Sequence, residues 1–378
     1  MKAFIKWAGG KEKELPFILS NLPKHFDRYI EPFVGGGSVY FSVDKQKSII
    51  NDKSDELIKL YNFIKVGDNK FLSKIEQLHH NFQLLECVVE NNSDELLNIY
   101  KNYCNEKLNN KDLKSKYNNI IRCFVIEHSN EFNGVLTEDF NIQIENFINE
   151  IQKNLISKIS RMNKIESTRG FLKNDNILEN IESAFKSAFY MHFRYLYNYK
   201  NELNIEPEFA SAIFYFIREY CYASMFRYNK QGKFNVPYGG ISYNRKDFRK
   251  KIQYIKSKEI RDYMENTEIY NLDFEDFCNK IKLTESDFIF LDPPYDTEFS
   301  TYAGNDFDKD DQIRLANYLK NTKAKFMLVI KNTDFIYNLY NIEGFYIKSF
   351  DKKYLVSFQN RNNKNAEHLI ITNYNTEE

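Results

Sequence analysis

One four-residue run, Asp292-Pro293-Pro294-Tyr295, carries the groups needed to hold a planar amino group. Asp292 supplies a carboxylate acceptor. The two prolines resist helix and Pro293 lacks an N–H, so a backbone carbonyl can point outward as a second acceptor. Tyr295 offers an aromatic face on which a purine can stack. Two acceptors around an NH2 group favour a pyramidal, more nucleophilic nitrogen, so the run predicts chemistry on an exocyclic amine.

The position of this run in the chain supports the prediction. It directly follows the apolar run 287–291, which predicts a buried strand. Ligands of open α/β sheets bind beyond the carboxyl ends of the strands. A strand that merely ends in a proline turn is the simpler alternative, and the complete Asp-Pro-Pro-Tyr sequence favours the functional interpretation.

A second motif is the glycine-rich segment 31–38, EPFVGGGS, between a predicted strand and a predicted helix. Glycines let the backbone approach a bound cofactor closely. The segment has neither the GxGxxG pattern of dinucleotide sites nor the GK[ST] of phosphate loops. Asp52 ends the next predicted strand, where a carboxylate can accept hydrogen bonds from ribose hydroxyls. Together they suit an adenosyl cofactor that lacks phosphates.

A third motif, 6–11 (KWAGGK), contains the only tryptophan of the chain between two lysines and before a Gly-Gly turn. A buried structural tryptophan is the alternative interpretation. Together with the other two motifs, the segment is predicted to be a loop that faces cofactor and substrate.

Short apolar runs bounded by turn residues must position these motifs. Segment 28–50 predicts a strand, a glycine turn, a helix and a strand. Further strands are predicted near the other end of the chain, with helical stretches between several of them: Asp287–Leu291, Lys325–Ile330, Phe345–Phe350 and His368–Tyr374. This alternation predicts a doubly wound, Rossmann-like α/β sheet with helices on both faces.

Residues 71–206 interrupt this pattern with a stretch almost free of Gly and Pro and helical in period. Apolar residues recur at three- and four-residue steps from Ile144 to Ile159, and again from Phe209 to Tyr220 after Pro207. We interpret both stripes as core contacts. The sequence therefore predicts a mostly helical domain inserted into the α/β fold.

Composition excludes several classes of protein. The 378 residues include 53 Lys+Arg and 53 Asp+Glu, so the net charge is zero. The chain therefore lacks the overall basic charge that often marks a nucleic-acid-binding protein. The basic cluster at 245–251 is most simply a solvated helix face or loop. Five scattered cysteines and the absence of a CxxC or HExxH motif predict neither disulfides nor a metal site. No apolar run is long enough to cross a membrane, and the N-terminal residues do not read as a signal peptide, so we expect a cytoplasmic protein.

KWAGGK, EPFVGGGS and DPPY, in that order, resemble the Dam-like (alpha-group, D12 class) DNA adenine-N6 methyltransferases that use S-adenosylmethionine. Segment 227–239 resembles the DNA-reading hairpin of that family, and the likeness continues through Phe307 and Gln312. It covers about residues 1–66, 210–317 and, more loosely, 324–374. Two departures are the long region 71–206, and the sequence Ala223-Ser224-Met225-Phe226 near Tyr222, where Asn-Gly is often seen.

The resemblance implies roles for particular residues. It implies that the flipped adenine is held by Asp292, Pro293, Pro294 and Tyr295. It implies an S-adenosylmethionine site formed by Trp7, Lys11, Glu31, Pro32, Phe33, Gly35, Gly37, Ser38, Asp52, Asp273, Phe274 and Asp292. It implies that Lys6 and Arg227 read guanines, that Tyr222 is an aromatic wedge, and that the same DNA-reading surface includes Met225, Asn229, Asn235 and Pro237.

The resemblance also implies a domain division and partners. Residues 1–70 and 260–378 would form the catalytic domain, 71–206 a helical insertion of unknown role, and 207–259 the target-recognition region with its hairpin. Double-stranded DNA, with a GATC-like or GAT-containing site, would be the substrate. A cognate restriction endonuclease could act on the same site, and the chain would be a monomer or weak dimer without metal.

Other substrates and classes stay open at this stage. Cytosine-N4 methyltransferases more often have Ser where Asp292 stands, and glutamine-N5 methyltransferases have Asn. An RNA adenine is a further candidate substrate. A non-catalytic protein that binds S-adenosylmethionine and DNA is the alternative from another class, and the intact acidic residues of the motifs weigh against it.

Overall fold

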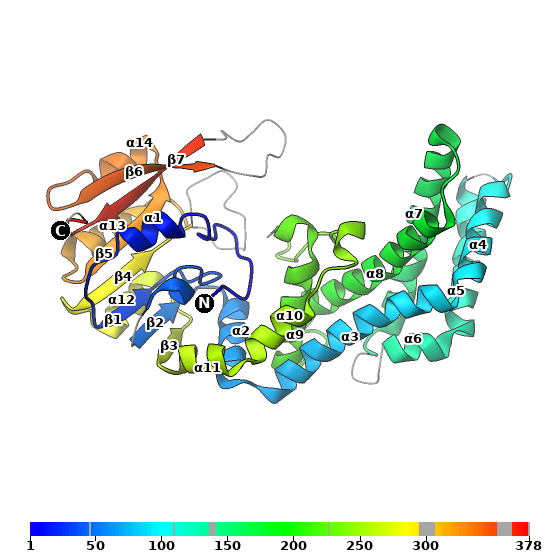
Figure 1. The fold of residues 1–378 in the computed structure, drawn as a ribbon, viewed down its shortest axis with the longest axis horizontal. Helices are drawn as coiled ribbons and strands as arrows, with labels where there is room; N and C mark the ends of the chain where they lie inside the picture. The colour runs from blue at the N-terminus through cyan, green and yellow to red at the C-terminus, as the bar shows by residue number, and fades with distance from the viewer. Residues whose placement is uncertain are drawn as a thin grey trace. The chain divides into compact units, whose positions relative to one another are not determined.

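The computed structural model describes residues 1–44, 47–108, 110–135, 141–225, 227–294, 307–353 and 365–376. The chain folds into two compact units (Figure 1). The sheet unit comprises residues 1–67, 226–232 and 254–378, and the helical unit comprises 68–225 and 233–253. In the described part of the chain, no helix is long and apolar enough to cross a membrane.

A seven-stranded sheet, counted over the described residues, forms the sheet unit, in the order β3-β2-β1-β4-β5-β7-β6. Strand β7 is antiparallel to β5 and β6, and the pairs from β3 through to β5 are parallel. The strands are β1 (Arg28–Glu31), β2 (Lys47–Asn51), β3 (Thr267–Tyr270), β4 (Asp287–Leu291), β5 (Lys325–Lys331), β6 (Tyr346–Lys353) and β7 (Asn365–Thr372). The predicted Rossmann-like α/β sheet is confirmed.

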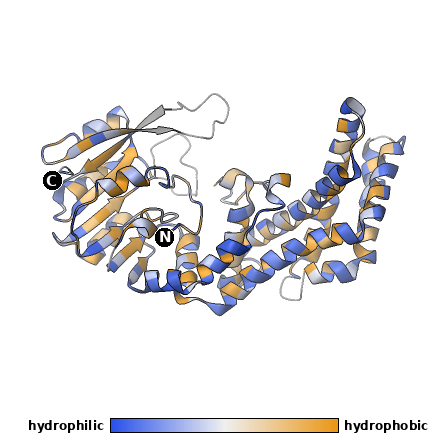
Figure 2. Ribbon diagram, in the orientation of Figure 1, coloured by the Kyte–Doolittle hydropathy of each residue, from blue (hydrophilic) through white to orange (hydrophobic). Residues whose placement is uncertain are grey.

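Helices cover both faces of this sheet, which explains why the central strands β4 and β5 are apolar along most of their length (Figure 2). One face packs against α12 (Phe274–Ile281), α13 (Lys309–Asn321) and α14 (Asp334–Tyr340). On the opposite face, the ring of Tyr374 contacts Phe288, and its hydroxyl donates to the carbonyl at the end of α1 (Leu15–Ser20). Helix α2 (Asp55–Val66) packs beside β3.

The predicted helix after the glycine turn is wrong in extent. Among residues 32–44, the described part of the connection between β1 and β2, the helical structure is limited to a short 3-10 turn, Tyr40–Ser42. Gly35 and Gly37 have φ of 49° and 75°, which lies in the left-handed region. A right-handed helix that begins at Tyr40 therefore cannot reach back through these two glycines. The rings of Tyr40 and Phe41 are buried against one another, with centroids 4.6 Å apart.

Long helices build the helical unit, as the region 71–206 predicts. They are α3 (Asn69–Asn91), α4 (Ser93–Asn105), α5 (Asn110–Glu127), α6 (Ser129–Val135), α7 (Ile144–Arg169), α8 (Asn174–Asn198) and α9 (Pro207–Tyr220). Their core is aromatic: Phe82 of α3, Phe189 of α8 and Phe216 of α9 have ring centroids 5.4–5.8 Å apart. The two predicted apolar stripes lie on α7 and α9 and are largely buried, although Ile144 is exposed.

Antiparallel pairing closes a loop directly after α9. The amide of Tyr222 donates to the carbonyl of Pro237 (2.8 Å), and that of Gly239 donates to Tyr220 (3.0 Å). A bridge between Cys221 and Tyr238 lies between these bonds. The predicted hairpin segment 227–239 overlaps this loop, and its residues 237 and 239 take part in the pairing. It is followed by α10 (Arg249–Lys256) and α11 (Lys258–Glu265).

Acidic partners neutralise much of the basic cluster at 245–251. Arg245 pairs with Glu86 and Glu182 of the helical unit, at 3.0 and 2.8 Å. Lys246 and Lys251 both pair with Glu219, at 2.8 and 2.6 Å. These cations therefore fix the segment after the loop to helices α3, α8 and α9.

A buried histidine on α8 makes the stability of the protein sensitive to acid. His192 is fully buried beside the Phe147 ring, and its Nδ1 lies 3.1 Å from the amide nitrogen of Asn146. Burial lowers the pKa of His192 from 6.5 to about 3. Between these two values the unfolded chain binds a proton that the folded chain does not, so stability falls as pH falls.

Unfolding in urea at pH 7.5 and pH 5.0 tests this. Between pH 7.5 and pH 5.0, the free energy of unfolding should fall by about 2 kcal/mol more in the wild type than in His192→Gln. The glutamine of the variant keeps an acceptor for Asn146 but does not bind a proton in this range. His80→Gln, at an exposed position of α3, is the matched control and should keep the wild-type loss. An equal loss in wild type and His192→Gln would contradict the assignment.

Candidate functional site

The predicted site residues follow the carboxyl ends of four neighbouring parallel strands. The glycine turn follows β1, Asp52 follows β2, Asp273 lies three residues after β3, and Asp292 follows β4. Strands β1 and β4 are adjacent, with Arg28 opposite Asp287 and Ile30 opposite Ile289. The chain leaves β1 toward β2 on one side, and β4 lies on the other, which is a topological switch point of the kind that binds ligands.

The glycine turn has no room for side chains. A Cβ on Gly35 would lie 2.8 Å from Cδ1 of Trp7, and one on Gly36 would lie 2.8 Å from the carbonyl oxygen of Ile5. A Cβ on Gly37 would lie 2.5 Å from the hydroxyl of Tyr61, which donates to the Gly35 carbonyl (3.1 Å). The half-buried Trp7 therefore packs directly on the turn, and the two motifs form one surface.

Asp52 fixes the other side of this turn. Its Oδ2 accepts from the amide of Gly35 and its Oδ1 from the amide of Ser54, both at 2.9 Å. Burial raises the pKa of Asp52, although these two hydrogen bonds act in the opposite direction. A carboxylate has about four lone-pair sites, so two amide donors leave it able to accept from ligand hydroxyls.

Glu31 and Pro32 belong to the floor of the site. Glu31 is 2% exposed, and its Oε2 accepts from the hydroxyl of Tyr29 at 2.7 Å. The Pro32 carbonyl accepts from Asn51, whose side chain also bonds both backbone groups of Leu272, at 2.9–3.0 Å. Asn51 thus ties together the ends of β1, β2 and β3.

Lys11 and Asp292 form an ion pair, although 280 residues separate them in the chain. Lys11 is only 2% exposed and Asp292 is 18% exposed. The Lys11 ammonium also donates to the carbonyl of Gly9 at 2.9 Å. The end of the KWAGGK segment therefore lies against the Asp-Pro-Pro run.

A buried side chain holds the proline turn after β4. Gln312 of α13 donates from Nε2 to the carbonyl of Pro294 at 3.3 Å. Pro293 is buried and Pro294 is exposed. Tyr295, predicted to stack on the base, lies outside the described residues.

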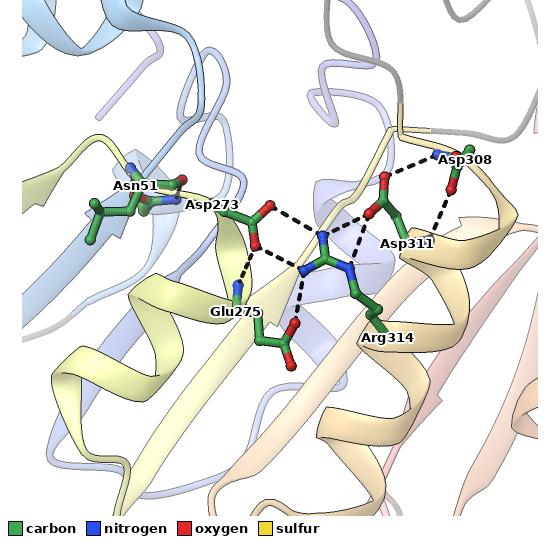
Figure 3. Close-up of polar contacts among 7 residues, drawn as sticks. Asn51, Asp273, Glu275, Asp308, Asp311 and Arg314 are labelled. Atoms are coloured by element: carbon green, nitrogen blue, oxygen red, sulfur yellow. Dashed lines mark hydrogen bonds and ion pairs between the residues drawn. The ribbon is translucent and has the colours of Figure 1, made fainter.

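Asp273 lies beside Arg314, an arginine that the sequence does not single out (Figure 3). Asp273 caps α12 by accepting from the amide of Glu275 (3.0 Å), and both of its oxygens lie 3.2 Å from the guanidinium of Arg314. Arg314 also pairs with Glu275 and Asp311, each at 2.7 Å. Burial would raise the pKa of Asp273, but the hydrogen bonds from Arg314 and from the Glu275 amide, together with the positive charges of Arg314 and Lys53, lower that pKa overall.

Three phenylalanines form an aromatic surface next to Asp273. Phe33 of the glycine motif lies 5.6 Å from the ring of Phe274 and 5.5 Å from that of Phe307. The Arg314 guanidinium lies over Phe274 at 4.8 Å. Phe274 and Phe307 are buried, so a flat heterocycle could stack only on the accessible part of the half-buried Phe33. Within the described residues, no group of three His, Cys, Asp or Glu side chains could hold a metal ion.

Some residues of this site were missed by the sequence analysis. Asn51 precedes Asp52 at a strand end, a position that could have drawn notice. Tyr61 and Arg314 lie on helices of ordinary composition, and only the fold shows that they contact the turn and Asp273. Gln312 falls within the family likeness, which assigned no role to it.

The predicted DNA-reading residues are divided between the two units. Lys6, Arg227 and Asn229 belong to the sheet unit, and both cations are exposed. The other four belong to the helical unit: Tyr222, Met225, Asn235 and Pro237. Tyr222 is 45% exposed at the start of the closed loop.

The two residues after Tyr222 take a left-handed conformation without glycine. Ala223 and Ser224 have φ of 51° and 52°, and the Ala223 amide donates to the hydroxyl of Tyr243 at 3.1 Å. Asn and Gly adopt this region at least cost. The local backbone is therefore one that Asn-Gly would favour, although the residues differ.

Comparison with known proteins shows the class. A family model described as D12 class N6 adenine-specific DNA methyltransferase matches residues 7–126 and 122–356. The chain belongs to this family, and it is an enzyme that acts on DNA.

Full-length relatives agree with this. The chain is 29% identical to the type II methyltransferase M.MjaIII of Methanocaldococcus jannaschii, covering 99% of each chain. It is 26% identical to the type II methyltransferase M.CviBI of Paramecium bursaria Chlorella virus NC1A, covering 99% of this chain and 100% of the relative. It is 22% identical to the DNA adenine methylase of Vibrio cholerae, covering 88% of this chain and 82% of the relative.

Proposed function

We propose that this enzyme transfers a methyl group from S-adenosylmethionine to N6 of an adenine that is flipped out of duplex DNA. The observation that supports this most is the pairing of Asp292, at the end of β4, with Lys11 beside the glycine turn. This ion pair brings together two parts of the proposed site. Asp292 is a carboxylate that can bind an exocyclic amine, and the glycine turn can bind an adenosyl group.

The residues present fit S-adenosylmethionine. The Gly35–Gly37 turn offers backbone where any Cβ would collide, and Asp52 can accept ribose hydroxyls. The half-buried Phe33 offers a ring face for the adenine base of the cofactor, the buried Phe274 ring packs against Phe33, and Asp273 directly precedes Phe274 in the chain. The turn lacks the lysine of a phosphate loop, in keeping with a cofactor without phosphates. Trp7, Lys11, Glu31, Pro32 and Ser38 would complete this site.

The chain's own groups would hold and orient the target amine. When bound, S-adenosylmethionine supplies the electrophilic methyl group. Asp292 accepts one N6 hydrogen while it remains paired with Lys11, because a carboxylate has lone pairs for both. A carbonyl of the Asp292–Pro294 turn accepts the other, and Gln312 holds that turn. Tyr295 would stack on the flipped base.

DNA recognition would come from residues on both units. Lys6 and Arg227 would contact guanines, for which the Arg fork is suited to O6 and N7. Tyr222 would fill the gap left by the flipped adenine. Met225, Asn235 and Pro237 of the helical unit and Asn229 of the sheet unit would also contact DNA, and we propose a GATC-like or GAT-containing target.

The biological setting is proposed by analogy with the type II relatives. The enzyme would protect the target of a cognate restriction endonuclease, or act as an orphan methylase, in the cytoplasm. It would work as a monomer or weak dimer.

Transfer of labelled methyl groups tests the activity. Duplex DNA incubated with the protein and methyl-labelled S-adenosylmethionine should yield label on adenine N6 after digestion to nucleosides. Label on cytosine, on RNA alone or on protein amides would contradict the proposed substrate. Methylation-sensitive sequencing of the product then gives the target site.

A further inference from the structure

Helix α8 carries four polar residues at four-residue steps that all donate to the backbone of the segment 234–244. Lys186 donates to the carbonyl of Asn244 (3.0 Å), Tyr190 and Arg194 donate to that of Val236 (both 2.9 Å), and Asn198 donates to that of Phe234 (2.9 Å). Residues four apart lie on one face of a helix. The four side chains therefore form a ladder, which we call the α8 ladder.

The contact at Asn198 fixes both backbone groups of one residue. While Nδ2 of Asn198 donates to the Phe234 carbonyl, Oδ1 accepts from the Phe234 amide at 2.8 Å. A side-chain amide that bonds both groups reproduces the pairing of a neighbouring strand. Phe234 is thereby held in extended backbone against α8.

The anchored segment alternates between buried and accessible side chains. Phe234, Val236 and Tyr238 are 2%, 0% and 7% exposed, whereas Asn235 is partly exposed and Pro237 is exposed. An extended chain points successive side chains to opposite faces. Fixing residues 234, 236 and 238 on the helical unit therefore turns Asn235 and Pro237 away from it.

Lys186, at the N-terminal end of the ladder, is fixed by a buried ion pair. Lys186 is fully buried and pairs with Glu182 at 2.6 Å, and Asn244, whose carbonyl it binds, accepts from the hydroxyl of Tyr238 at 3.0 Å. A buried cation with its partners in place is costly to disturb. The ladder thus holds the segment at two points, near Phe234 and near Asn244.

We propose that the α8 ladder is the device that fixes the segment 234–244 on the helical unit and thereby presents Asn235 and Pro237 to DNA. This inference rests on the proposed function, since it gives a role to the part of the chain that the catalytic site does not use. Lys186, Tyr190, Arg194 and Asn198 are positioning residues, which act through the loop and not by contact with the reacting atoms.

Asn198→Ala tests the ladder, with Asn180→Ala as the matched control. Asn180 lies on the same helix, where its side chain bonds the carbonyl of Asn176 and the ammonium of Lys158. Asn198→Ala should raise KM for duplex DNA about tenfold, the effect of losing one or two hydrogen bonds, and should relax preference at one base pair of the target. It should leave kcat and the Kd of S-adenosylmethionine within about twofold. Asn180→Ala should match the wild type; Asn198→Ala with wild-type KM and preference would overturn the inference.

A double-mutant cycle separates positioning from general damage. If Asn198 acts through Asn235, the double variant Asn198→Ala/Asn235→Ala should bind DNA no more weakly than Asn235→Ala alone. If the affinity lost in the double variant equals the product of the losses in the two single variants, the proposal is overturned. Tyr190→Phe, which removes only one hydroxyl, repeats the test should Asn198→Ala fold poorly.

Hydrogen exchange tests the ladder without any enzyme activity. The Phe234 amide should exchange about tenfold faster in Asn198→Ala than in Asn180→Ala, because it loses its acceptor. Equal rates would overturn the inference even if the enzyme methylates adenine. Wild-type protein that methylates no DNA would instead count against the proposed function, while the exchange result would stand.

Discussion

Asp292→Asn should lower kcat for methyl transfer by roughly 100-fold or more, because the neutral amide oxygen is a weaker acceptor than the carboxylate for the hydrogens of the target amine. Single-turnover assays with saturating DNA and cofactor measure this step directly. The variant should also lose stability, since Lys11 is 2% exposed and would remain buried without its partner. Breaking a buried pair in this way costs about 3–5 kcal/mol.

The double variant Lys11→Met/Asp292→Asn distinguishes catalysis from packing. Removing both charges should recover much of the free energy of unfolding lost in either single variant, measured by urea unfolding. It should not recover methyl transfer. A stable double variant that regains the wild-type rate would show that Asp292 acts only by holding Lys11.

Gly37→Ala should destabilise the sheet unit by about 2–4 kcal/mol, the combined cost of a left-handed alanine and an overfilled core. Its φ is 75°, and the new Cβ would lie 2.5 Å from the hydroxyl of the buried Tyr61 and 3.0 Å from the ring of Phe41. Displacing Tyr61 also releases the Gly35 carbonyl, so affinity for S-adenosylmethionine should fall. Urea unfolding and titration calorimetry measure the two effects.

Gly344→Ala is the matched control for this change. Its φ is 85°, but nothing lies within 4 Å of the position of its Cβ. It should therefore show only the backbone cost, about 1–2 kcal/mol, and normal cofactor affinity. Equal losses in the two variants would mean that the contact with Tyr61 contributes nothing.

Local patterns in the sequence were sufficient to predict most strands and the helical region. The run 287–291 coincides with β4, and the strand predicted at 325–330 is β5, one residue longer. Strand β3 was missed because its four residues, Thr-Glu-Ile-Tyr, contain no apolar run and only Thr267 is buried. It forms at the edge of the sheet because β2 offers it a partner.

Long-range pairs are what the sequence could not show. Nothing in KWAGGK or DPPY indicates that Lys11 meets Asp292, since this contact depends on the parallel pairing of β1 with β4. The Arg314 pairs and the α8 ladder likewise need packed helices before their polar residues acquire partners. Predicted roles for the cofactor-binding and DNA-reading residues stay predictions until the variants are measured.

The division of the sheet unit into distant stretches of chain has a consequence for its synthesis. Strand β1 lies between β2, which follows within 20 residues, and β4, whose first residue is 287. At translation rates of about 5–20 residues per second, the nascent β1 waits on the order of 10–50 s for that neighbour. The helical unit is nearly continuous in the chain and can fold on the ribosome during this delay. We therefore expect exposed β1 and β2 to depend on chaperones until the final third of the polypeptide emerges.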